Sequence, residues 1–198
     1  TATSPMYTES GTKTFKITGD VTLYAVWKIE RLYLYKDGDK CIGVTGGWTA
    51  KKVTESASAT FREDSDKFYL RGKGQANGIH HGRVDVFTTN KIDMSNYSKI
   101  CFEYSGKIGN TYSTSMKTDS LIHSGIKSEI SMATGSQSKI ITRNKETTHG
   151  DISKKTVEVS LVGYDDSYHV FFGVQGAAND SGTTIETYAY LYNVYLDP

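Results

Sequence analysis

The sequence predicts an all-β protein, an antiparallel β-sandwich with a small β-hairpin unit at its N-terminal end. Short stretches in which apolar and polar residues alternate recur along the chain, which is typical of half-buried strands. No window shows the apolar spacing of an amphipathic helix with a cap at each end. Proline occurs only twice, so 19 glycines together with Asn, Asp, Ser and Thr supply the turns. Strands joined by turns, without helical crossovers, favour an antiparallel sandwich.

The first strands belong to a short N-terminal unit. Phe15–Thr18 and Val21–Trp27 alternate around Gly19-Asp20, a pattern that predicts a hairpin. We place a domain boundary near Lys28 to Leu32. It separates a β unit in residues 1–30 from a sandwich in residues 31–198.

The first half of the sandwich begins with a strand over Leu32–Tyr35 and a turn over Lys36–Lys40. In the segment from Ile100 to Tyr104 every second residue is apolar, so one face looks inward. Ser105 to Ser128 has no firm period and predicts a long polar loop. Further short strands are predicted at Ser58–Phe61, Phe68–Arg71 and Arg83–Thr88.

The second half carries the clearest alternation. Ile130–Met132 and Ile140–Thr142 predict a hairpin across Gly135-Ser136. The longest strand is predicted over Ile185–Leu196, where tyrosines on both faces leave the inward side open. Inward-facing residues of two more strands are Val157, Val159 and Leu161, then Val170, Phe172 and Val174.

Composition excludes some function classes. Lys plus Arg total 23 and Asp plus Glu 22, so the charge of +1 gives no basic field for nucleic acid. No apolar stretch approaches a membrane span, so we expect no membrane insertion. The chain begins Thr-Ala-Thr, and we expect it to be cut from a longer protein. The 14 tyrosines suit half-buried strands, which explain most of them, and they also suit binding surfaces.

The sequence carries none of the motifs that mark a nucleophile elbow, a zinc-binding helix or a phosphate loop, so we predict no enzyme activity. We expect no cofactor, although Asp37-Gly38-Asp39 offers oxygens either to a structural calcium ion or simply to a turn. Cys41 and Cys101 fit no metal spacing. They form either a disulfide or two free thiols.

Six residues are candidates for ligand binding, each with a structural alternative. Trp48 follows two glycines and is either an exposed platform for a sugar or a plug at one end of the sandwich. Adjacent histidines on a strand point to opposite faces, so a shared metal is disfavoured. If His80 and His81 lie in a loop, they either bind a ligand or remain solvated. The other candidates are His80, His81 and Arg83, then Tyr112 and His123 in the predicted polar loop.

Residues 7–28 resemble the closing half of an internalin-type B repeat. The resemblance rests on Gly11 to Trp27, which ends in the pattern D-V-T-L-Y-A-x-W of that family. The characteristic first half of the repeat is missing. Such repeats occur along surface proteins of Gram-positive bacteria. The resemblance therefore implies a secreted or cell-surface parent protein.

Residues 32–198 resemble the galactose-binding-like jelly rolls of bacterial surface and phage tail proteins. The pattern I-D-x-S-x-Y-x-x-I at Ile92–Ile100 carries this resemblance, together with Val157–Leu161, Tyr168–Val174 and Tyr192–Leu196. Such domains often carry a structural calcium ion. They include lectins and adhesins, so the fold alone does not set a function. We predict an extracellular, non-catalytic glycan-binding module. The alternative is a structural or adhesive domain of a surface protein or phage tail, acting through protein contacts.

Overall fold

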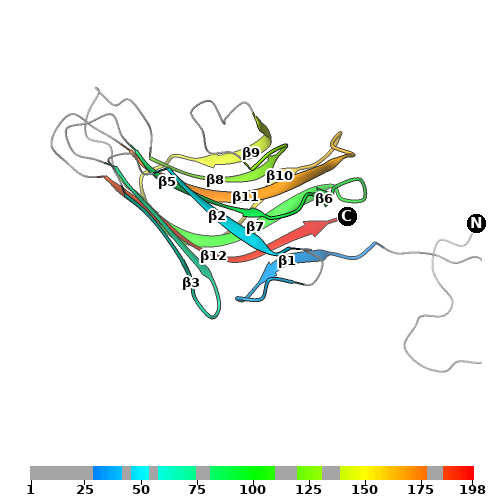
Figure 1. The fold of residues 1–198 in the computed structure, drawn as a ribbon, viewed down its shortest axis with the longest axis horizontal. Helices are drawn as coiled ribbons and strands as arrows, with labels where there is room; N and C mark the ends of the chain where they lie inside the picture. Colours follow the sequence, from blue (N-terminus) through cyan, green and yellow to red (C-terminus); the bar gives the residue numbers. More distant parts are fainter. Residues whose placement is uncertain are drawn as a thin grey trace, which may run out of the picture. The chain divides into compact units, whose positions relative to one another are not determined.

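The fold is an antiparallel β-sandwich of the jelly-roll type (Figure 1). A computed structural model of the chain describes residues 29–41, 46–53, 58–74, 81–109, 120–130, 139–177 and 185–198. In this part of the chain two six-stranded sheets pack face to face, and every pair of neighbouring strands is antiparallel. Residues 31–198 form one compact unit. The predicted hairpin and repeat in residues 7–28 lie outside the described residues and stay predictions.

The first sheet, sheet A, is built around the longest strand of the protein. Its order is β10-β7-β12-β4-β3, and β1 also pairs with β12. The bounds are β1 Leu32–Lys36, β3 Ser58–Glu63, β4 Phe68–Lys73, β7 Lys99–Ile108, β10 Gly150–Ser160 and β12 Glu186–Asp197.

The second sheet, sheet B, has the order β2-β5-β11-β8-β9, and β6 pairs with the start of β11. The two strands that flank β11, β5 and β8, are buried along their whole length. The bounds are β2 Trp48–Val53, β5 Gly82–Thr88, β6 Ile92–Asp93, β8 Leu121–Lys127, β9 Ile140–Glu146 and β11 Ser167–Gly176.

The core lies between the sheets and follows the period of two. Alternate residues of β7, β10 and β11 point inward and lie in the core or pack against it, as the alternation predicts. Burial of these side chains supplies the main driving force for folding. The inward members include Phe102, Tyr104, Val159, Phe172 and Val174.

One predicted loop is wrong. Ser105 to Ser128 contains the end of β7 and the whole of β8, which pairs with both β11 and β9. The sequence LIHSGIK shows no alternation of apolar and polar residues because both faces of β8 are buried. Neither face is therefore marked by exposed polar side chains. The predicted strand at Ile140–Thr142 is confirmed, but its partner is β8. Ile130 follows β8 and is not itself part of a strand, and Met132 lies outside the described residues.

The inward side of β12 changes along the strand. Thr187, Ala189 and Leu191 are buried at odd positions, whereas Val194 and Leu196 are buried at even positions. The register with β7 shifts between Leu191 and Asn193, which marks a β-bulge. The bulge keeps apolar residues inward on both sides of it and turns the tyrosines outward.

The segment Asp37-Gly38-Asp39 forms a tight turn at the end of β1. Two backbone hydrogen bonds between Lys36 and Asp39 close it, at 2.9 and 2.8 Å. Gly38 has a φ of 87°, and a Cβ there would overlap the carbonyl of Ser65, so glycine is needed. Among the described residues no group of three or more His, Cys, Asp or Glu side chains is placed to hold a metal.

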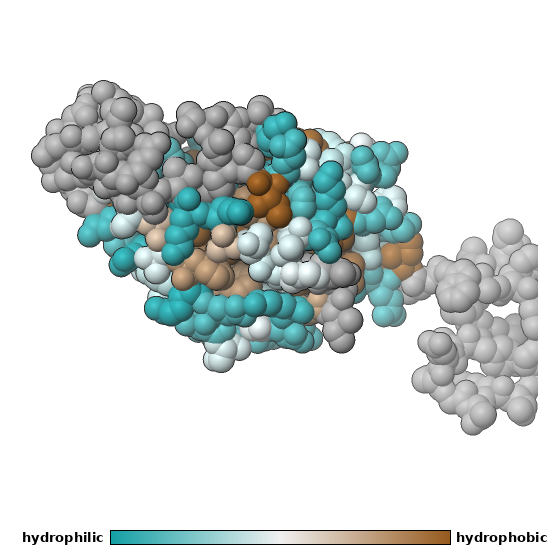
Figure 2. Space-filling model, viewed as in Figure 1, coloured by the Kyte–Doolittle hydropathy of each residue, from teal (hydrophilic) through white to brown (hydrophobic). Residues whose placement is uncertain are grey.

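Cys41 and Cys101 are both free thiols, the first half-buried and the second buried. On the face shown in Figure 2, hydrophilic residues make up much of the coloured surface, and hydrophobic ones stand in small groups. In the part of the chain that is described, no helix is long and apolar enough to cross a membrane.

Candidate functional site

The outward face of sheet A carries a group of tyrosines, which we call the tyrosine face: Tyr69, Tyr188, Tyr190 and Tyr192. All four are half-buried, so part of each ring is exposed to solvent. Tyr69 of β4 is directly opposite Tyr190 of β12, and the next pair along is Arg71 and Tyr188. Directly opposite residues on one face of a sheet are close neighbours, so the register brings the rings together.

The rings of Tyr69, Tyr188 and Tyr190 form one continuous cluster. The ring centroids of Tyr69 and Tyr190 are 5.1 Å apart, those of Tyr188 and Tyr190 are 5.9 Å apart, and those of Tyr69 and Tyr188 are 6.4 Å apart. Cationic side chains surround the cluster. Lys154 Nζ lies 4.4 Å from the ring centre of Tyr192, and the Arg62 guanidinium lies 4.7 Å from that of Tyr69.

Hydrogen-bonding groups extend the tyrosine face over β7 and β10. Glu103 accepts hydrogen bonds from Asn193 Nδ2 and lies 2.7 Å from Lys154 Nζ. Burial alone raises the pKa of the Glu103 carboxyl, but the hydrogen bonds from Lys154 and Asn193 outweigh it, so the pKa falls below its usual value. The Tyr192 hydroxyl is 3.2 Å from Ser105 Oγ. The face thus combines ring surface with charged and neutral polar groups.

The outward face of sheet B carries a second cluster, of different character. We call it the buried polar cluster: Arg83 and Asp85 of β5, His123 and Lys127 of β8, and Arg143 of β9. Asp85, His123 and Lys127 are at most 1% exposed, although they point away from the core between the sheets. Charged groups at this depth need partners or a function.

Asp85 is the centre of the buried polar cluster. Its Oδ1 lies 3.0 Å from His123 Nε2 and accepts a 3.0 Å hydrogen bond from Arg83 Nε. Its Oδ2 accepts a second bond from Arg83 Nη2 at 2.5 Å and lies 3.5 Å from Lys127 Nζ. One carboxylate is therefore shared by three side chains.

A glycine leaves room for the contact between Asp85 and His123. Asp85 and His123 are both in register with Gly173 of β11, which lies between their strands. A Cβ on Gly173 would overlap the Asp85 carboxylate and the His123 ring. The two side chains meet above β11 because this position has no side chain.

Burial and charge set the protonation states of the cluster. Burial tends to raise the pKa of Asp85, but the electrostatic interactions and hydrogen bonds with His123 and Arg83 outweigh it and hold the pKa well below its usual value. Burial lowers the pKa of His123 to about 4, with Asp85 opposing the shift. Burial also lowers the pKa of Lys127. At neutral pH Asp85 is thus ionised and His123 is neutral.

Two of the six predicted site residues, Arg83 and His123, meet in this cluster through Asp85. Trp48 lies elsewhere: its Nε1 donates a 3.0 Å hydrogen bond to the carbonyl of Leu34, and its ring packs edge-on against Tyr35 and Phe68. This placement matches the structural alternative, a plug, more closely than an exposed platform. His81 is half-buried just before β5, and His80 and Tyr112 lie outside the described residues.

Asp85, Lys127 and the residues of the tyrosine face are not among the predicted site residues. A signal for the face exists in the sequence, since Tyr188, Tyr190 and Tyr192 recur with a period of two. No such signal exists for the cluster around Asp85, because His123 and Lys127 come from a strand far along the chain.

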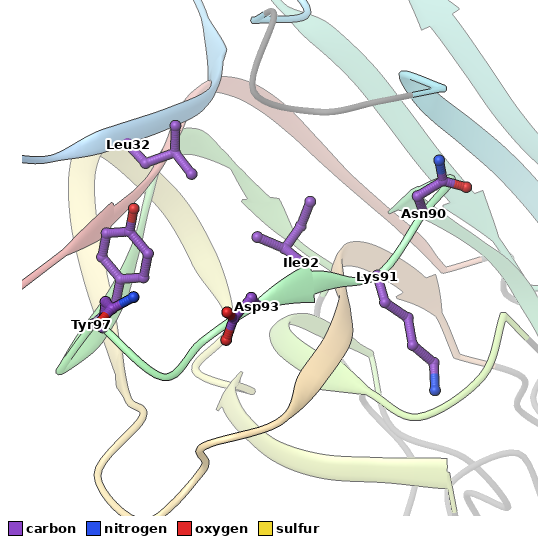
Figure 3. A pocket seen from close by; sticks show the side chains of 7 residues that line it. Leu32, Asn90, Lys91, Ile92, Asp93 and Tyr97 are labelled. Atoms are coloured by element: carbon purple, nitrogen blue, oxygen red, sulfur yellow. The ribbon is translucent and has the colours of Figure 1, made fainter.

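A shallow pocket of about 300 Å³ lies beside β6. Its lining includes Ile92, Asp93 and Tyr97 of the I-D-x-S-x-Y-x-x-I pattern, and the hydroxyl end of Tyr97 points toward Leu32 (Figure 3). Asp93 accepts a 2.9 Å hydrogen bond from the backbone of Ser95, so this aspartate shapes a turn. The polar side chains here are exposed, and the pattern has a structural role.

Several solved structures are similar to this chain over most of its length. A family 11 carbohydrate-binding module from Clostridium thermocellum, in complex with a β-1,3-1,4-mixed-linked tetrasaccharide, is 13% identical with a TM-score of 0.47. The match covers 86% of this chain and 97% of that one. The K1 cleaved adhesin domain of Lys-gingipain from Porphyromonas gingivalis is 11% identical with a TM-score of 0.47, covering 84% and 97%.

A family 29 module from Piromyces equi is 10% identical with a TM-score of 0.40, and the match covers 85% of this chain and 90% of that one. No family model matches the sequence, and neither does a curated protein. These similarities concern the course of the chain. What the chain binds has to be argued from its own residues.

Proposed function

We propose that this chain is a non-catalytic glycan-binding module that acts outside the cell, and that the glycan lies on the tyrosine face. The observation that carries the proposal is the cluster of half-exposed rings at Tyr69, Tyr188 and Tyr190, with centroids 5.1 to 6.4 Å apart. Sugar rings present apolar C–H faces that pack on aromatic rings, and their hydroxyls need polar partners at the rim.

The rim of the tyrosine face supplies such partners. Arg71 of β4 donates from Nη2 to Thr60 Oγ1 at 3.4 Å and lies 3.8 Å from Glu186, both weak contacts that a hydroxyl can replace. Its Nε is buried without a hydrogen-bond partner among the described residues. Glu103 and Asn193 add an acceptor and a donor on the other side of the rings.

The test is affinity gel electrophoresis and a glycan array on the purified chain, comparing wild type with Y188A/Y190A. Wild type should be retarded by at least one polysaccharide, and the double variant should bind it at least tenfold more weakly. A tenfold loss corresponds to about 1.4 kcal/mol, a modest fraction of what two ring contacts contribute.

Tyr164→Ala is the matched control, since Tyr164 lies in the turn between β10 and β11 and its ring contacts Tyr168 of β11. It should bind as wild type does once circular dichroism has shown that each variant is folded. If the folded wild type binds no glycan at all, or if Y188A/Y190A binds as well as wild type, the proposal fails.

The tyrosine face also supports a second candidate, an adhesive surface for another protein. Tyrosine and arginine are enriched at protein interfaces, and Arg62 and Arg71 flank Tyr69 here. This candidate predicts self-association or capture of a surface protein that is weakened by Y188A/Y190A. Sedimentation of wild type and the double variant, together with the glycan array, separates the two candidates.

A further inference from the structure

We propose that the buried polar cluster on sheet B binds an oxyanion that carries a neighbouring hydroxyl, the chemistry of an acidic sugar. The site is separate from the tyrosine face, which lies on the other sheet. It rests on two observations that are independent of that face: an excess of buried positive charge, and buried polar atoms without partners.

The charges of the cluster do not balance. Arg83, Lys127 and Arg143 are cationic side chains, and Asp85 is the one carboxylate that the described residues place in contact with the cluster. Both oxygens of Asp85 are already engaged by Arg83, and one is shared with His123. An anion is therefore what the cluster lacks, because buried charges are stable only when they are compensated.

Three polar atoms of the cluster are buried and have no hydrogen-bond partner among the described residues. They are His123 Nδ1, Lys127 Nζ and Arg143 Nη1. Buried polar atoms are rarely left without a hydrogen bond, and Lys127 has only a 3.5 Å ion pair to Asp85, so three such atoms in one place call for an explanation. A bound oxyanion accepts hydrogen bonds from Lys127 and Arg143, and these charge-assisted bonds are among the strongest in proteins.

The register of β8 and β9 gathers these three atoms on one face. Gly125 is in register with Arg143, and His123 and Lys127 stand two residues to either side of it on the same strand. Gly125 lets β9 approach closely, since a Cβ there would overlap the carbonyl of Thr142 and the Cα of Arg143, and Arg143 is thereby brought beside the face that carries His123 and Lys127. Arg143 is half-buried on the edge strand β9, so the cluster reaches solvent on that side.

The tautomer of His123 is the reason why the proposed ligand also carries a hydroxyl group. The Asp85 carboxylate is ionised and faces Nε2 at 3.0 Å, so the neutral imidazole carries its proton on Nε2 and donates it to Asp85. Nδ1 then has a lone pair and accepts a hydrogen bond. An oxyanion alone cannot supply that donor, whereas a hydroxyl next to a carboxylate can.

Two aromatic rings complete the site. Lys127 Nζ lies 5.1 Å from the ring centre of Phe87 and 4.9 Å from that of Phe171. The His123 ring stands edge-on to Phe171 at 5.0 Å. These contacts hold the ammonium and the imidazole in place.

The experiment measures the melting temperature of the whole chain with glucuronate, sulfate, acetate or glucose, at constant ionic strength held by NaCl. Glucuronate at about tenfold above its Kd should raise the melting temperature by roughly 3–5 °C. Sulfate and acetate should raise it less, and glucose should not raise it at all. A response to sulfate equal to that of glucuronate would reject the hydroxyl partner, and no response to any anion would overturn the site.

Variants connect the response to the named atoms. Lys127→Met and Arg143→Gln should each weaken glucuronate binding at least tenfold, measured on the folded variants. A purely structural role of these side chains predicts instead that the folded variants keep the full glucuronate response. Lys154→Met, on the tyrosine face, is the charge-matched control and should keep the full response. Y188A/Y190A should also keep it, so failure here is distinguishable from failure of the proposed glycan site.

Discussion

Asp85 and His123 are joined by a 3.0 Å hydrogen bond although their strands, β5 and β8, lie on opposite sides of β11. Neighbouring strands are about 4.8 Å apart, so these two backbones are separated by about twice that distance. The side chains bridge the gap over Gly173, the residue of β11 that is in register with both. A glycine in a central strand weakens it unless something needs the space, and here two buried side chains need it.

Gly173→Ala should therefore destabilise the fold. The new methyl group would overlap the Asp85 carboxylate and the His123 ring, and would push apart a pair that is fully buried. We expect a loss of about 1–3 kcal/mol in the free energy of unfolding, as for overpacked cores. Urea unfolding measures it, with Ser153→Ala at an exposed site of β10 as the control. A variant as stable as wild type would contradict the contact.

Stability should also fall as the pH drops from about 6.5 to about 4. Burial lowers the pKa of His123 to about 4 in the folded chain, whereas an unfolded histidine titrates near 6.5. The unfolded state thus binds more protons in this window, so the stabilisation present above pH 6.5 is lost progressively, by roughly 3 kcal/mol in total. The charged neighbours are Arg83 and Asp85 on β5, Lys127 on β8 and Arg143 on β9.

Asp85 extends the loss to lower pH. Its pKa is held well below the usual value in the folded chain, so the stability it contributes is present above pH 4 and is lost below it. His123→Gln isolates the histidine, because glutamine does not titrate. The free energy of unfolding of this variant should change less between pH 6.5 and 4 than that of wild type. Parallel pH profiles for the two proteins would show that His123 is not buried in its neutral form.

The sandwich could be predicted from the sequence because its inward faces follow a simple rule. Phe102 and Tyr104 of β7, and Phe172 and Val174 of β11, alternate with neighbours on the other face, and all four are buried in the core. Two sheets with such faces have one stable arrangement, in which the faces meet.

Two features could not be predicted, for physical reasons. In β8 the outward residues His123 and Lys127 are as buried as the inward Ile122 and Ile126. The strand therefore has no solvent-exposed face whose polar residues would reveal the period of two. In β12 the bulge after Leu191 reverses the phase of the alternation, and a single period does not fit the whole strand.

Part of the buried polar cluster could be predicted from the sequence. Arg83 and His123 were singled out as separate residues, and the structure brings them together through Asp85. Their meeting depends on the order β5-β11-β8 in sheet B, which joins strands far apart in the chain. Residue types suggest candidates, but only the topology decides which of them share a face.

Trp48 should contribute to stability and not to glycan binding. Its ring closes the core beside Tyr35 and Phe68, and its Nε1 satisfies the carbonyl of Leu34. Trp48→Ala should cost about 2–4 kcal/mol in the free energy of unfolding, since the half-buried ring leaves a cavity. Trp48→Phe should cost about 1–2 kcal/mol, mainly through the lost hydrogen bond. Both values come from chemical denaturation.

The same two variants test the prediction that Trp48 is an exposed sugar platform. Below the denaturation midpoint the folded variants should bind a glycan as wild type does, if the ring serves only the core. A tenfold loss of affinity in Trp48→Phe, which keeps an aromatic ring, would instead place the indole in contact with the ligand.

Substitutions of Tyr190, at the centre of the tyrosine face, separate the contribution of its ring to glycan binding from that of its hydroxyl. Its ring lies 5.1 Å from that of Tyr69 and 5.9 Å from that of Tyr188, so it has neighbours on two sides. Tyr190→Phe keeps the ring and should change glycan affinity by less than about threefold, whereas Tyr190→Ala should lower it by about tenfold or more. Isothermal titration with the best glycan from the array measures both. Equal losses for the two variants would mean that the hydroxyl carries the contact, and the stacking argument for this face would be wrong.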